Sequence, residues 1–142
     1  MSTVSSLLAR KNRSSITVSP NTPVIEALQI MAEKNIGSVI VMENGKYFGI
    51  VTERDYSRKV ILKGKNSATI LVSEIMSTDL PSVKPGDSIE HCMELMTSKN
   101  IRYMPVFEKD ALLGIVSMSD VVKETILAQK ETIDQLQNYI QS

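Results

Sequence analysis

The sequence predicts an α/β fold of two β-α-β-β-α repeats, related by a pseudo-twofold axis and packed as one module. The first observation is that the segment GIVTERD at residues 49–55 returns as GIVSMSD at residues 114–120. The second is that an offset of 65 residues aligns the halves without a gap, so that Lys34-Asn35-Ile36 meets Lys99-Asn100-Ile101. A period of this length in only two copies indicates two halves of one domain and not a solenoid.

The first half begins with a short strand and an amphipathic helix. Val18 marks the strand, and a turn at residues 20–22 follows it. Thr22 is the expected N-cap of the helix, because Pro23 suits the first helical position. The apolar stripe of this helix comprises Ala27, Leu28, Ile30 and Met31, and Lys34-Asn35 ends it.

Two strands and a second helix complete the half. Residues 36–42 have the composition of a buried strand, Asn44-Gly45 is a hairpin signal, and residues 47–51 form the returning strand. The second helix is expected from Glu53 to Lys63, with Gly64 as the stop signal.

A short segment of similar sequence precedes each repeat. Val4-Ser-Ser-Leu-Leu resembles Val72-Ser-Glu-Ile-Met, so we expect a short packed helix at both places. The predicted division is a first repeat with its N-terminal helix at residues 1–66 and a second repeat with an extended C-terminal helix at residues 67–142. The Ser-rich start, which lacks acidic residues, is also compatible with a transit peptide.

The last helix is expected to run from about Ser119 to about Ile140, far beyond the end of its counterpart. One seam of side chains recurs along it at alternating spacings of four and three residues, as in a coiled coil. The seam comprises Val122, Ile126, Gln129, Ile133, Leu136 and Ile140. It indicates a self-association surface, and the alternative is that the helix lies back on its own domain.

Composition restricts the classes of partner. Hydrophobic residues make up 42% and charged residues 23% of the 142 residues, as in ordinary globular proteins. Sixteen basic and sixteen acidic residues cancel, so we expect neither nucleic-acid binding nor attachment to a membrane. The single cysteine, Cys92, excludes an internal disulfide and favours a cytoplasmic protein. Cys92 aligns with Ala27 and is expected to be a buried filler, and the single His91 makes no metal site.

Each repeated motif leads from an apolar strand into a hydroxyl residue followed three positions later by an acid. The pairs are Thr52 with Asp55 and Ser117 with Asp120. This is the pattern of a helix N-cap, in which the hydroxyl accepts a free backbone N–H and the acid faces the positive helix end. The same junction can present N–H groups and a hydroxyl to a phosphate. Capping explains a single motif well, whereas its repetition favours ligand binding.

Two copies of G-apolar-V-[T/S]-x-x-D, each preceded by K-N-I and a strand, resemble the CBS domain pair, or Bateman module. The resemblance covers residues 4 to about 127, and the segment Thr52–Lys59 is most similar to small stand-alone pairs. It implies a non-catalytic regulatory module of the energy-sensing kind, with two clefts for AMP, ADP, ATP, NAD(H) or S-adenosylmethionine. AMP or ATP is the expected ligand. It also implies a homodimer that signals ligand occupancy to a regulated protein.

Carried over by position, the resemblance assigns ribose binding to Asp55 and Asp120. The expected phosphate-binding residues are Thr52, Arg54, Arg58, Arg102, Ser117 and Ser119. The expected adenine contacts are Thr17, Val18, Ile101, Tyr103 and Pro105 for the Asp120 cleft, and Ile36, Ser38, Val39, Ser82 and Val83 for the Asp55 cleft.

The basic residues differ between the copies, so we do not expect equal occupancy of the two clefts. Arg54 corresponds to Ser119, and Arg102 corresponds to Gly37. The planar guanidinium suits phosphate, but Arg54 and Arg58 also have the spacing of a solvated helix face. The Asp120 cleft is the one better suited to AMP.

Two other classes of function are open. An enzyme is disfavoured because one His, one unpaired Cys and no clustered acids supply no pair of nucleophile and base. A structural or adaptor homodimer with vestigial clefts is compatible with both motif acids, since both also serve as helix caps.

Overall fold

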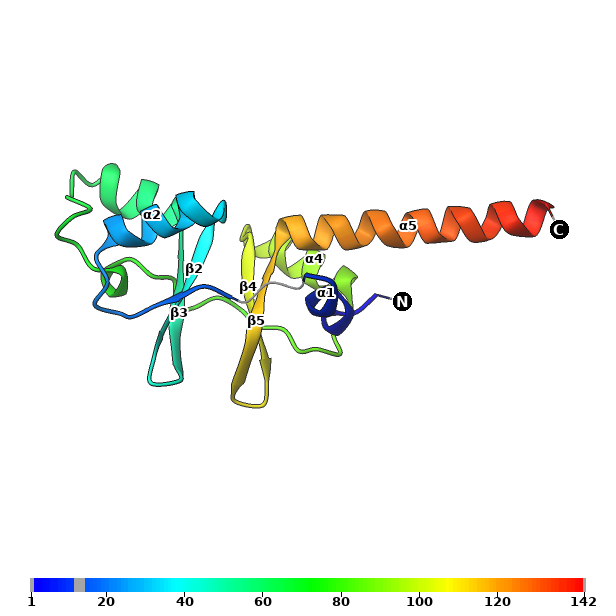
Figure 1. Cartoon of the computed structure of the whole chain (residues 1–142), viewed down its shortest axis with the longest axis horizontal. Helices are drawn as coiled ribbons and strands as arrows, with labels where there is room; N and C mark the ends of the chain where they lie inside the picture. The colour runs from blue at the N-terminus through cyan, green and yellow to red at the C-terminus, as the bar shows by residue number, and fades with distance from the viewer. Residues whose placement is uncertain (1, 12–14, 142) are drawn as a thin grey trace. The chain divides into compact units, whose positions relative to one another are not determined.

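The computed structural model describes residues 2–11 and 15–141, and its contacts divide the chain into two compact units. One unit is Ser15–Leu80, and the other is Met1–Ser14 together with Pro81–Ser142. Each unit holds one of the two repeats, with a small sheet and helices beside it (Figure 1). The predicted α/β class is confirmed.

The unit Ser15–Leu80 is built on a three-stranded sheet of order β1-β2-β3. β1 pairs with β2 in parallel, and β2 pairs with β3 antiparallel, so the predicted hairpin is present. The elements in chain order are β1 (Thr17–Val18), α2 (Val24–Lys34), β2 (Ser38–Glu43), β3 (Lys46–Thr52), α3 (Glu53–Tyr56), the π-helical turn η1 (Ser57–Ile61) and the 3-10 turn η2 (Val72–Glu74).

The turns and helix ends of this unit use residues in the left-handed region where the sequence predicts them. Asn44 and Gly45 have φ of 53° and 76°, as the hairpin turn requires at both central positions. Asn35 ends α2 with φ of 55°, and its counterpart Asn100 ends α4 (Ile89–Lys99) with φ of 53°. Gly64 has φ of 67°, which fits its predicted role as a stop.

Two local predictions need correction. The N-cap of α2 is Pro23 and not Thr22, and no side chain caps this end; the Thr22 hydroxyl lies 3.2 Å from that of Ser19 instead. The helix predicted from Glu53 to Lys63 is α-helical only to Tyr56 and continues as η1 to Ile61. In η1 the Leu62 N–H donates to the Ser57 carbonyl, five residues back, which widens this turn.

The other unit repeats this arrangement with different neighbours. Its elements are α1 (Val4–Lys11), α4 (Ile89–Lys99), β4 (Tyr103–Glu108), β5 (Ala111–Ser117) and α5 (Met118–Gln141). β4 and β5 form an antiparallel hairpin, and Val83 makes a parallel bridge to Val106 as β1 does to β2. Ser88 caps α4 by accepting the His91 N–H at 3.1 Å. Cys92 is fully buried in this unit's core, as predicted.

The N-terminal helix α1 packs on the second repeat. The Val4 N–H donates to the carbonyl of Asp87 at 2.9 Å, and the side chains of Val4 and Leu7 lie in the core with Met96. The compact unit therefore joins the start of the chain to its end.

The segment that precedes the second repeat packs on the first one. The Val72 N–H donates to the Thr22 carbonyl at 2.9 Å, and Ile50 and Ser77 exchange two backbone hydrogen bonds of 2.8 and 3.1 Å. Val72 and Ile75 are buried in the core of the unit Ser15–Leu80. The segment before each repeat therefore packs with the other repeat. In the predicted division at residues 1–66 and 67–142, each segment belongs to the repeat that follows it in the chain.

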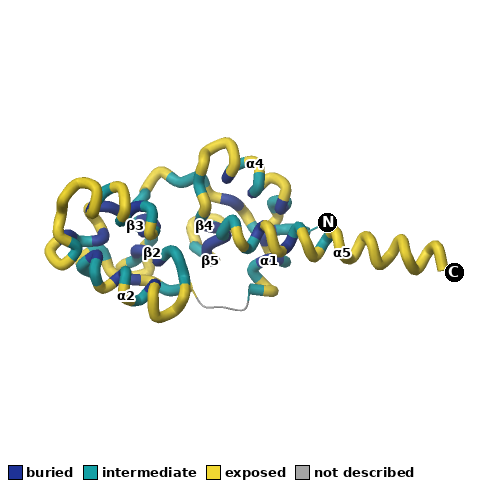
Figure 2. Tube along the Cα trace, turned by 90° about the horizontal axis from the view of Figure 1, so that it is seen from above, coloured by how far each residue is buried: buried dark blue, intermediate teal, exposed yellow. Residues whose placement is uncertain are grey.

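The long helix α5 is buried only near its start. Val121 and Glu124 are buried, whereas all residues from Gln129 to Gln141 are exposed (Figure 2). Its extent agrees with the predicted helix from about Ser119 to Ile140. Within residues 2–11 and 15–141, no helix combines the length and the apolar character that crossing a bilayer requires.

Candidate functional site

The first motif forms a reciprocal capping box at the start of α3. The Asp55 N–H donates to Thr52 Oγ1 at 3.1 Å, and the Thr52 N–H donates to Asp55 Oδ2 at 3.0 Å. The Thr52 hydroxyl lies 3.1 Å from the same Oδ2 and donates to it. The predicted cap is therefore confirmed, and it fixes the carboxylate of Asp55 at the helix end.

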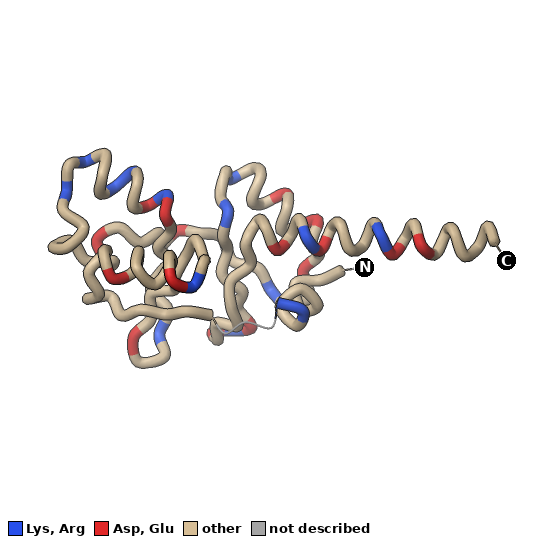
Figure 3. The backbone as a smooth tube through the Cα atoms, turned by 45° about the horizontal axis from the view of Figure 1, so that its top comes forward, with Lys and Arg blue, Asp and Glu red and all other residues tan. Residues whose placement is uncertain are grey.

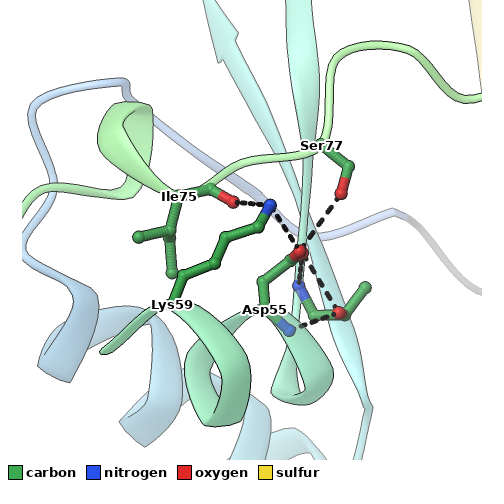
Figure 4. Close-up of polar contacts among 5 residues, drawn as sticks. Asp55, Lys59, Ile75 and Ser77 are labelled. Carbon is green, nitrogen blue, oxygen red and sulfur yellow. Dashed lines mark hydrogen bonds and ion pairs between the residues drawn. The ribbon is translucent and has the colours of Figure 1, made fainter. Parts of the chain in front are cut away.

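The other carboxylate oxygen of Asp55 is also occupied (Figure 4). The Lys59 ammonium lies 2.9 Å from Oδ1, and the Ser77 hydroxyl donates to Oδ1 at 3.1 Å. Lys59 also donates to the Ile75 carbonyl at 2.8 Å, so its side chain joins the motif to the segment after η2. Only 9% of the Asp55 side chain is exposed. A ribose that bonds to both oxygens would have to displace Lys59 or Ser77.

The second motif forms the same cap at the start of α5. The Ser117 N–H donates to Asp120 Oδ2 at 3.0 Å, and the Asp120 N–H donates to Ser117 Oγ at 3.1 Å. The ammonium of Lys11, on α1, lies 3.0 Å from Oδ2 and donates to the Ile115 carbonyl at 2.9 Å. These contacts reach one oxygen of Asp120, whereas the contacts of Asp55 engage both of its oxygens.

The electrostatic surroundings of Asp120 favour its charged form. Burial alone would raise the pKa of this carboxyl, but the Ser117 N–H and the Lys11 ammonium outweigh burial, so the pKa lies below its usual value. Asp120 is therefore an anion at neutral pH, which suits the acceptance of hydroxyl hydrogen bonds.

A hollow of about 450 Å³ lies beside the second motif. Its walls include Ile101 and Arg102 just before β4 and Tyr103 at its start, with Ser117 and Ser119 where β5 passes into α5. Four of the residues predicted for the Asp120 cleft, together with the predicted phosphate-binding residue Arg102, thus meet around one hollow within one unit.

Asp120 itself lines a second hollow, of about 350 Å³, between α1 and α5. Arg10, Lys11 and Lys123 bring three cations to it, and Glu124 contributes a buried carboxylate 3.5 Å from the Arg10 guanidinium. Among residues 2–11 and 15–141, no group of three or more His, Cys, Asp or Glu side chains could hold a metal ion.

The remaining predicted residues lie within their own repeats. Thr17 and Val18 pair with Ile40 and Val41, and the Val83 N–H donates to the Pro105 carbonyl at 3.1 Å. The predicted adenine sites combine residues of both units, so those combinations stay predictions. The residues concerned in the unit Ser15–Leu80 are Thr17, Val18, Ile36, Ser38 and Val39, and those in the other unit are Ser82, Val83, Ile101, Tyr103 and Pro105.

Burial and exposure divide these residues further. Val39 and Val83 lie in the two cores, so they can offer a ligand little beyond backbone groups. Arg58 and Arg102 are exposed, and Arg54 is half-buried. Because Arg58 is exposed, it could bind a phosphate group or simply lie on the solvated face of its helix.

Sequence reasoning missed the two lysines that pair with the motif acids. Lys59 follows Asp55 by four residues on a helix, a spacing that favours an ion pair and could have been recognised. Lys11 lies more than a hundred residues from Asp120 in the chain, and no local pattern connects them.

The fold and these two junctions define a pair of α/β repeats, each with an acid fixed at a strand-to-helix turn. The family model of the CBS domain matches residues 4–61 and 72–126. The chain therefore belongs to the CBS domain family, and its two repeats are a CBS domain pair. Such pairs are regulatory modules that generally bind adenosine-containing ligands, and stand-alone members are generally non-catalytic.

Known proteins that resemble this chain include several that are described as CBS-domain proteins. The mitochondrial CBS domain-containing protein CBSX3 of Arabidopsis thaliana is 32% identical, over 98% of this chain and 72% of its own length. A solved protein with CBS domains from Burkholderia ambifaria is 40% identical with a TM-score of 0.85, over 90% of this chain and 96% of its own. The CBS domain pair of protein MJ0100, solved with 5-methylthioadenosine and S-adenosylmethionine, shares the fold at 24% identity, a TM-score of 0.77 and coverage of 92% and 98%.

Proposed function

We propose that this protein is a regulatory module that binds an adenosine ligand at the Asp120 junction and signals its occupancy to a protein partner. The observation that carries the proposal is the charged carboxylate of Asp120, which is fixed by Ser117, a residue that also lines the hollow with Arg102. A carboxylate can accept bonds from both hydroxyls of a ribose, while a hydroxyl and a guanidinium suit phosphate. MJ0100, whose CBS pair holds two adenosine compounds, supports this ligand class by likeness of fold.

AMP is the first ligand to test, with ADP, ATP, NAD(H) and S-adenosylmethionine as the other members of the class. The hollow beside Ser117 offers one arginine, Arg102, which matches a short phosphate group better than a long one. Arg54 and Arg58, which lie in the other unit, stay predicted phosphate-binding residues. Balanced charge and one buried cysteine favour a cytoplasmic protein.

A thermal-shift panel of these ligands, followed by calorimetric titration, tests the proposal. A ligand at one hundred times its dissociation constant adds about 2.7 kcal/mol, which raises the melting temperature by several degrees. The matched variant is Asp120→Asn, which keeps the side-chain shape but removes the charge. We expect it to weaken binding at least tenfold, because each charge-assisted bond is worth about 1.5 to 3 kcal/mol. Unchanged affinity in this variant would contradict the proposal.

The carboxylates of Asp55 and Asp120 should differ in how readily they can bind a ligand. Asp55 holds Lys59 and Ser77 on one oxygen and the Thr52 cap on the other. We propose that the Asp120 site fills first and that ligand binding at Asp55 requires its internal partners to move. The double variant Lys59→Met with Ser77→Ala should therefore raise affinity at the weaker site. Two sites of equal affinity in the unmodified protein would contradict the proposal that the Asp120 site fills first.

The rival function is a structural or adaptor homodimer, and one observation favours it: both acids serve as helix caps. In that case Asp120→Ala would cost roughly 1 kcal/mol of stability, and none of the adenosine ligands would shift the melting temperature. The panel and the variant together separate the two functions.

A further inference from the structure

Lys11 ties the end of α1 to the motif acid of the second repeat. α1 ends with Arg10 and Lys11, and both meet acids near the start of α5 (Figure 3). The Lys11 ammonium lies 3.0 Å from Asp120 Oδ2 and donates to the Ile115 carbonyl at 2.9 Å. The Lys11 side chain is 27% exposed, so this contact is accessible from solvent.

In the first repeat, a residue that is fixed by its backbone makes the matching contacts. Ile50 corresponds to Ile115, and the Ile50 carbonyl accepts the Ser77 N–H at 2.8 Å. The Ser77 hydroxyl donates to Asp55 Oδ1 at 3.1 Å. In the second repeat, one ammonium on a flexible stem makes both kinds of contact. The ammonium can therefore leave its acceptors without moving a strand, whereas the backbone N–H of Ser77 cannot.

The two oxygens of Asp120 are not equally available to a ligand. Oδ2 accepts the Ser117 N–H at 3.0 Å and also holds the Lys11 ammonium. An ionised carboxylate offers about two acceptor positions on each oxygen, so Oδ2 is filled. The contacts that residues 2–11 and 15–141 make with this carboxylate all reach Oδ2, which leaves Oδ1 open.

A ribose that donates both hydroxyls to Asp120 needs an acceptor position on each oxygen. One hydroxyl can donate to Oδ1, but the other meets the filled Oδ2. The Ser117 N–H belongs to the backbone at the start of α5 and cannot leave without unwinding that turn. Lys11 is therefore the group that gives way to the second hydroxyl.

Loss of this contact changes how the end of α1 is held. The first half of α1 is anchored by Val4 and Leu7, which are buried in the core. The end is held instead by the contacts of Lys11 and by Arg10, whose guanidinium lies 3.5 Å from the Glu124 carboxylate. Departure of Lys11 therefore loosens the end of α1 while its first half stays packed.

We propose that Lys11 is an internal competitor of the ligand at Asp120, so that ligand binding displaces its ammonium and loosens the end of α1. This inference rests on the proposed function and names the element through which occupancy of the Asp120 site is passed on. Because coupling is reciprocal, a partner that holds the end of α1 in place weakens ligand binding by the same factor by which the ligand weakens the partner.

The first test titrates AMP into the full chain by calorimetry. Lys11→Met keeps an apolar stem but removes the ammonium, and we expect it to bind AMP at least about fivefold more tightly than the unmodified protein. The matched control is Lys130→Met, which removes the same charge from an exposed position about 15 Å along α5 from Asp120. Charges at that distance are screened at physiological salt, so its affinity should stay within about twofold. Equal or weaker binding by Lys11→Met would overturn the proposal.

The second test uses 2′-deoxy-AMP and 3′-deoxy-AMP, each of which lacks one ribose hydroxyl. A single hydroxyl can donate to Oδ1 of Asp120 and leave Lys11 in place. Lys11→Met should therefore improve the binding of either analogue by no more than about twofold. A merely structural effect of Lys11 on this unit would change the affinities for all three nucleotides alike, and that result would refute the competition.

Hydrogen exchange followed by NMR tests the movement of α1. Saturating AMP should speed the exchange of the backbone amides of residues 10 and 11 at least about fivefold, and Lys11→Met should show this faster exchange without AMP. The Val4 amide, which donates to the Asp87 carbonyl, should not exchange faster. Unchanged or slower exchange at residues 10 and 11 with AMP would overturn the loosening of α1.

Failure of this inference and failure of the proposed function give different results. If AMP and the other ligands of the panel bind neither the unmodified protein nor Lys11→Met, the proposed function fails and this inference fails with it. If AMP binds both proteins with equal affinity, ligand binding stands and only the competition by Lys11 is refuted. The tightest nucleotide of the panel takes the place of AMP if AMP itself does not bind.

Discussion

At the residue scale, the two repeats neutralise their motif acids with lysines from different places. Lys59 pairs with Asp55 from one turn further along the same helical segment. The matching position in the second repeat is Glu124, which pairs with Arg10, and the ammonium beside Asp120 comes from Lys11. The same electrostatic result is therefore reached with a local pair in one repeat and a long-range pair in the other.

The pair of Lys11 and Asp120 makes stability depend on pH in the acid range. Because the folded-state pKa of Asp120 lies below its usual value of about 3.9, its contribution is complete above that value. The contribution is lost as the pH falls through the lower folded-state pKa. Urea unfolding over a series of pH values should show a larger stability difference between the unmodified protein and Asp120→Asn at about pH 6 than at about pH 2.

The control for this titration is Asp134→Asn, an exposed acid on the same helix. It should leave the pH dependence close to that of the unmodified protein. A stability difference for Asp120→Asn that stays constant over the whole range would show that this carboxyl is not a stabilising anion.

Cys92 should be chemically inert in the folded protein. Burial raises the pKa of its thiol to about 11, with a further contribution from the charge of Asp87, and the thiolate is the reactive form. Alkylation by iodoacetamide at about pH 8 should be at least about 100-fold slower in buffer than in guanidinium chloride. Equal rates in the two solvents would contradict the buried position of Cys92.

At the element scale, β3 allows one close approach by the segment that follows η2. A Cβ at Gly49 would lie 2.6 Å from the carbonyl oxygen of Ser77, and the backbone bonds between Ile50 and Ser77 leave that oxygen little freedom to move. Gly49→Ala should therefore reduce the free energy of unfolding by about 1 to 3 kcal/mol.

Gly86→Ala is the matched control, because no atom lies within 4 Å of a Cβ built there. It should change the free energy of unfolding by less than about 0.5 kcal/mol. If guanidinium unfolding gave the same midpoint for both variants, the close contact at Gly49 would be refuted.

The elements that sequence reasoning placed correctly are those with local causes. Asn44-Gly45 selects the hairpin turn by positive φ, Asn35 ends a helix for the same reason, and Thr52 and Asp55 cap each other three residues apart. The errors arose where tertiary contacts decide. The Thr22 carbonyl accepts the Val72 N–H, and the helix there begins after Pro23 without a side-chain cap. No local signal predicts the π-helical turn η1.

In the candidate site, too, the residues with local causes were predicted and those that depend on tertiary contacts were not. Ser117 and Asp120 follow from the repeated motif, and Arg102 and Tyr103 from their place at the start of the strand that pairs with β5 and just before it. The contact of Lys11 with Asp120 depends on where α1 packs. The resemblance of Val4-Ser-Ser-Leu-Leu to Val72-Ser-Glu-Ile-Met predicts a helix at α1 but not which repeat it joins.

At the scale of the whole molecule, the packing of the segment before each repeat determines which fragments of the chain can fold alone. The fragment 15–80 contains a complete compact unit, whereas the fragment 1–66 lacks Val72 and Ile75, which are 0% and 2% exposed. Burial of each such side chain is worth about 1.5 to 3 kcal/mol. We expect 15–80 to unfold cooperatively in a thermal melt and 1–66 to be markedly less stable. Equal melting temperatures would favour the predicted division at residue 66.

The packing of α1 on the last part of the chain also sets an order of events during synthesis. The first repeat is complete once residue 80 has left the ribosome, so it can fold while the rest is still being made. α1 is made before the second repeat, and its apolar residues Val4 and Leu7 have no core to enter until that repeat emerges. α1 is thus made before the first repeat but packs after it, and its apolar face is open to chaperones in the interval.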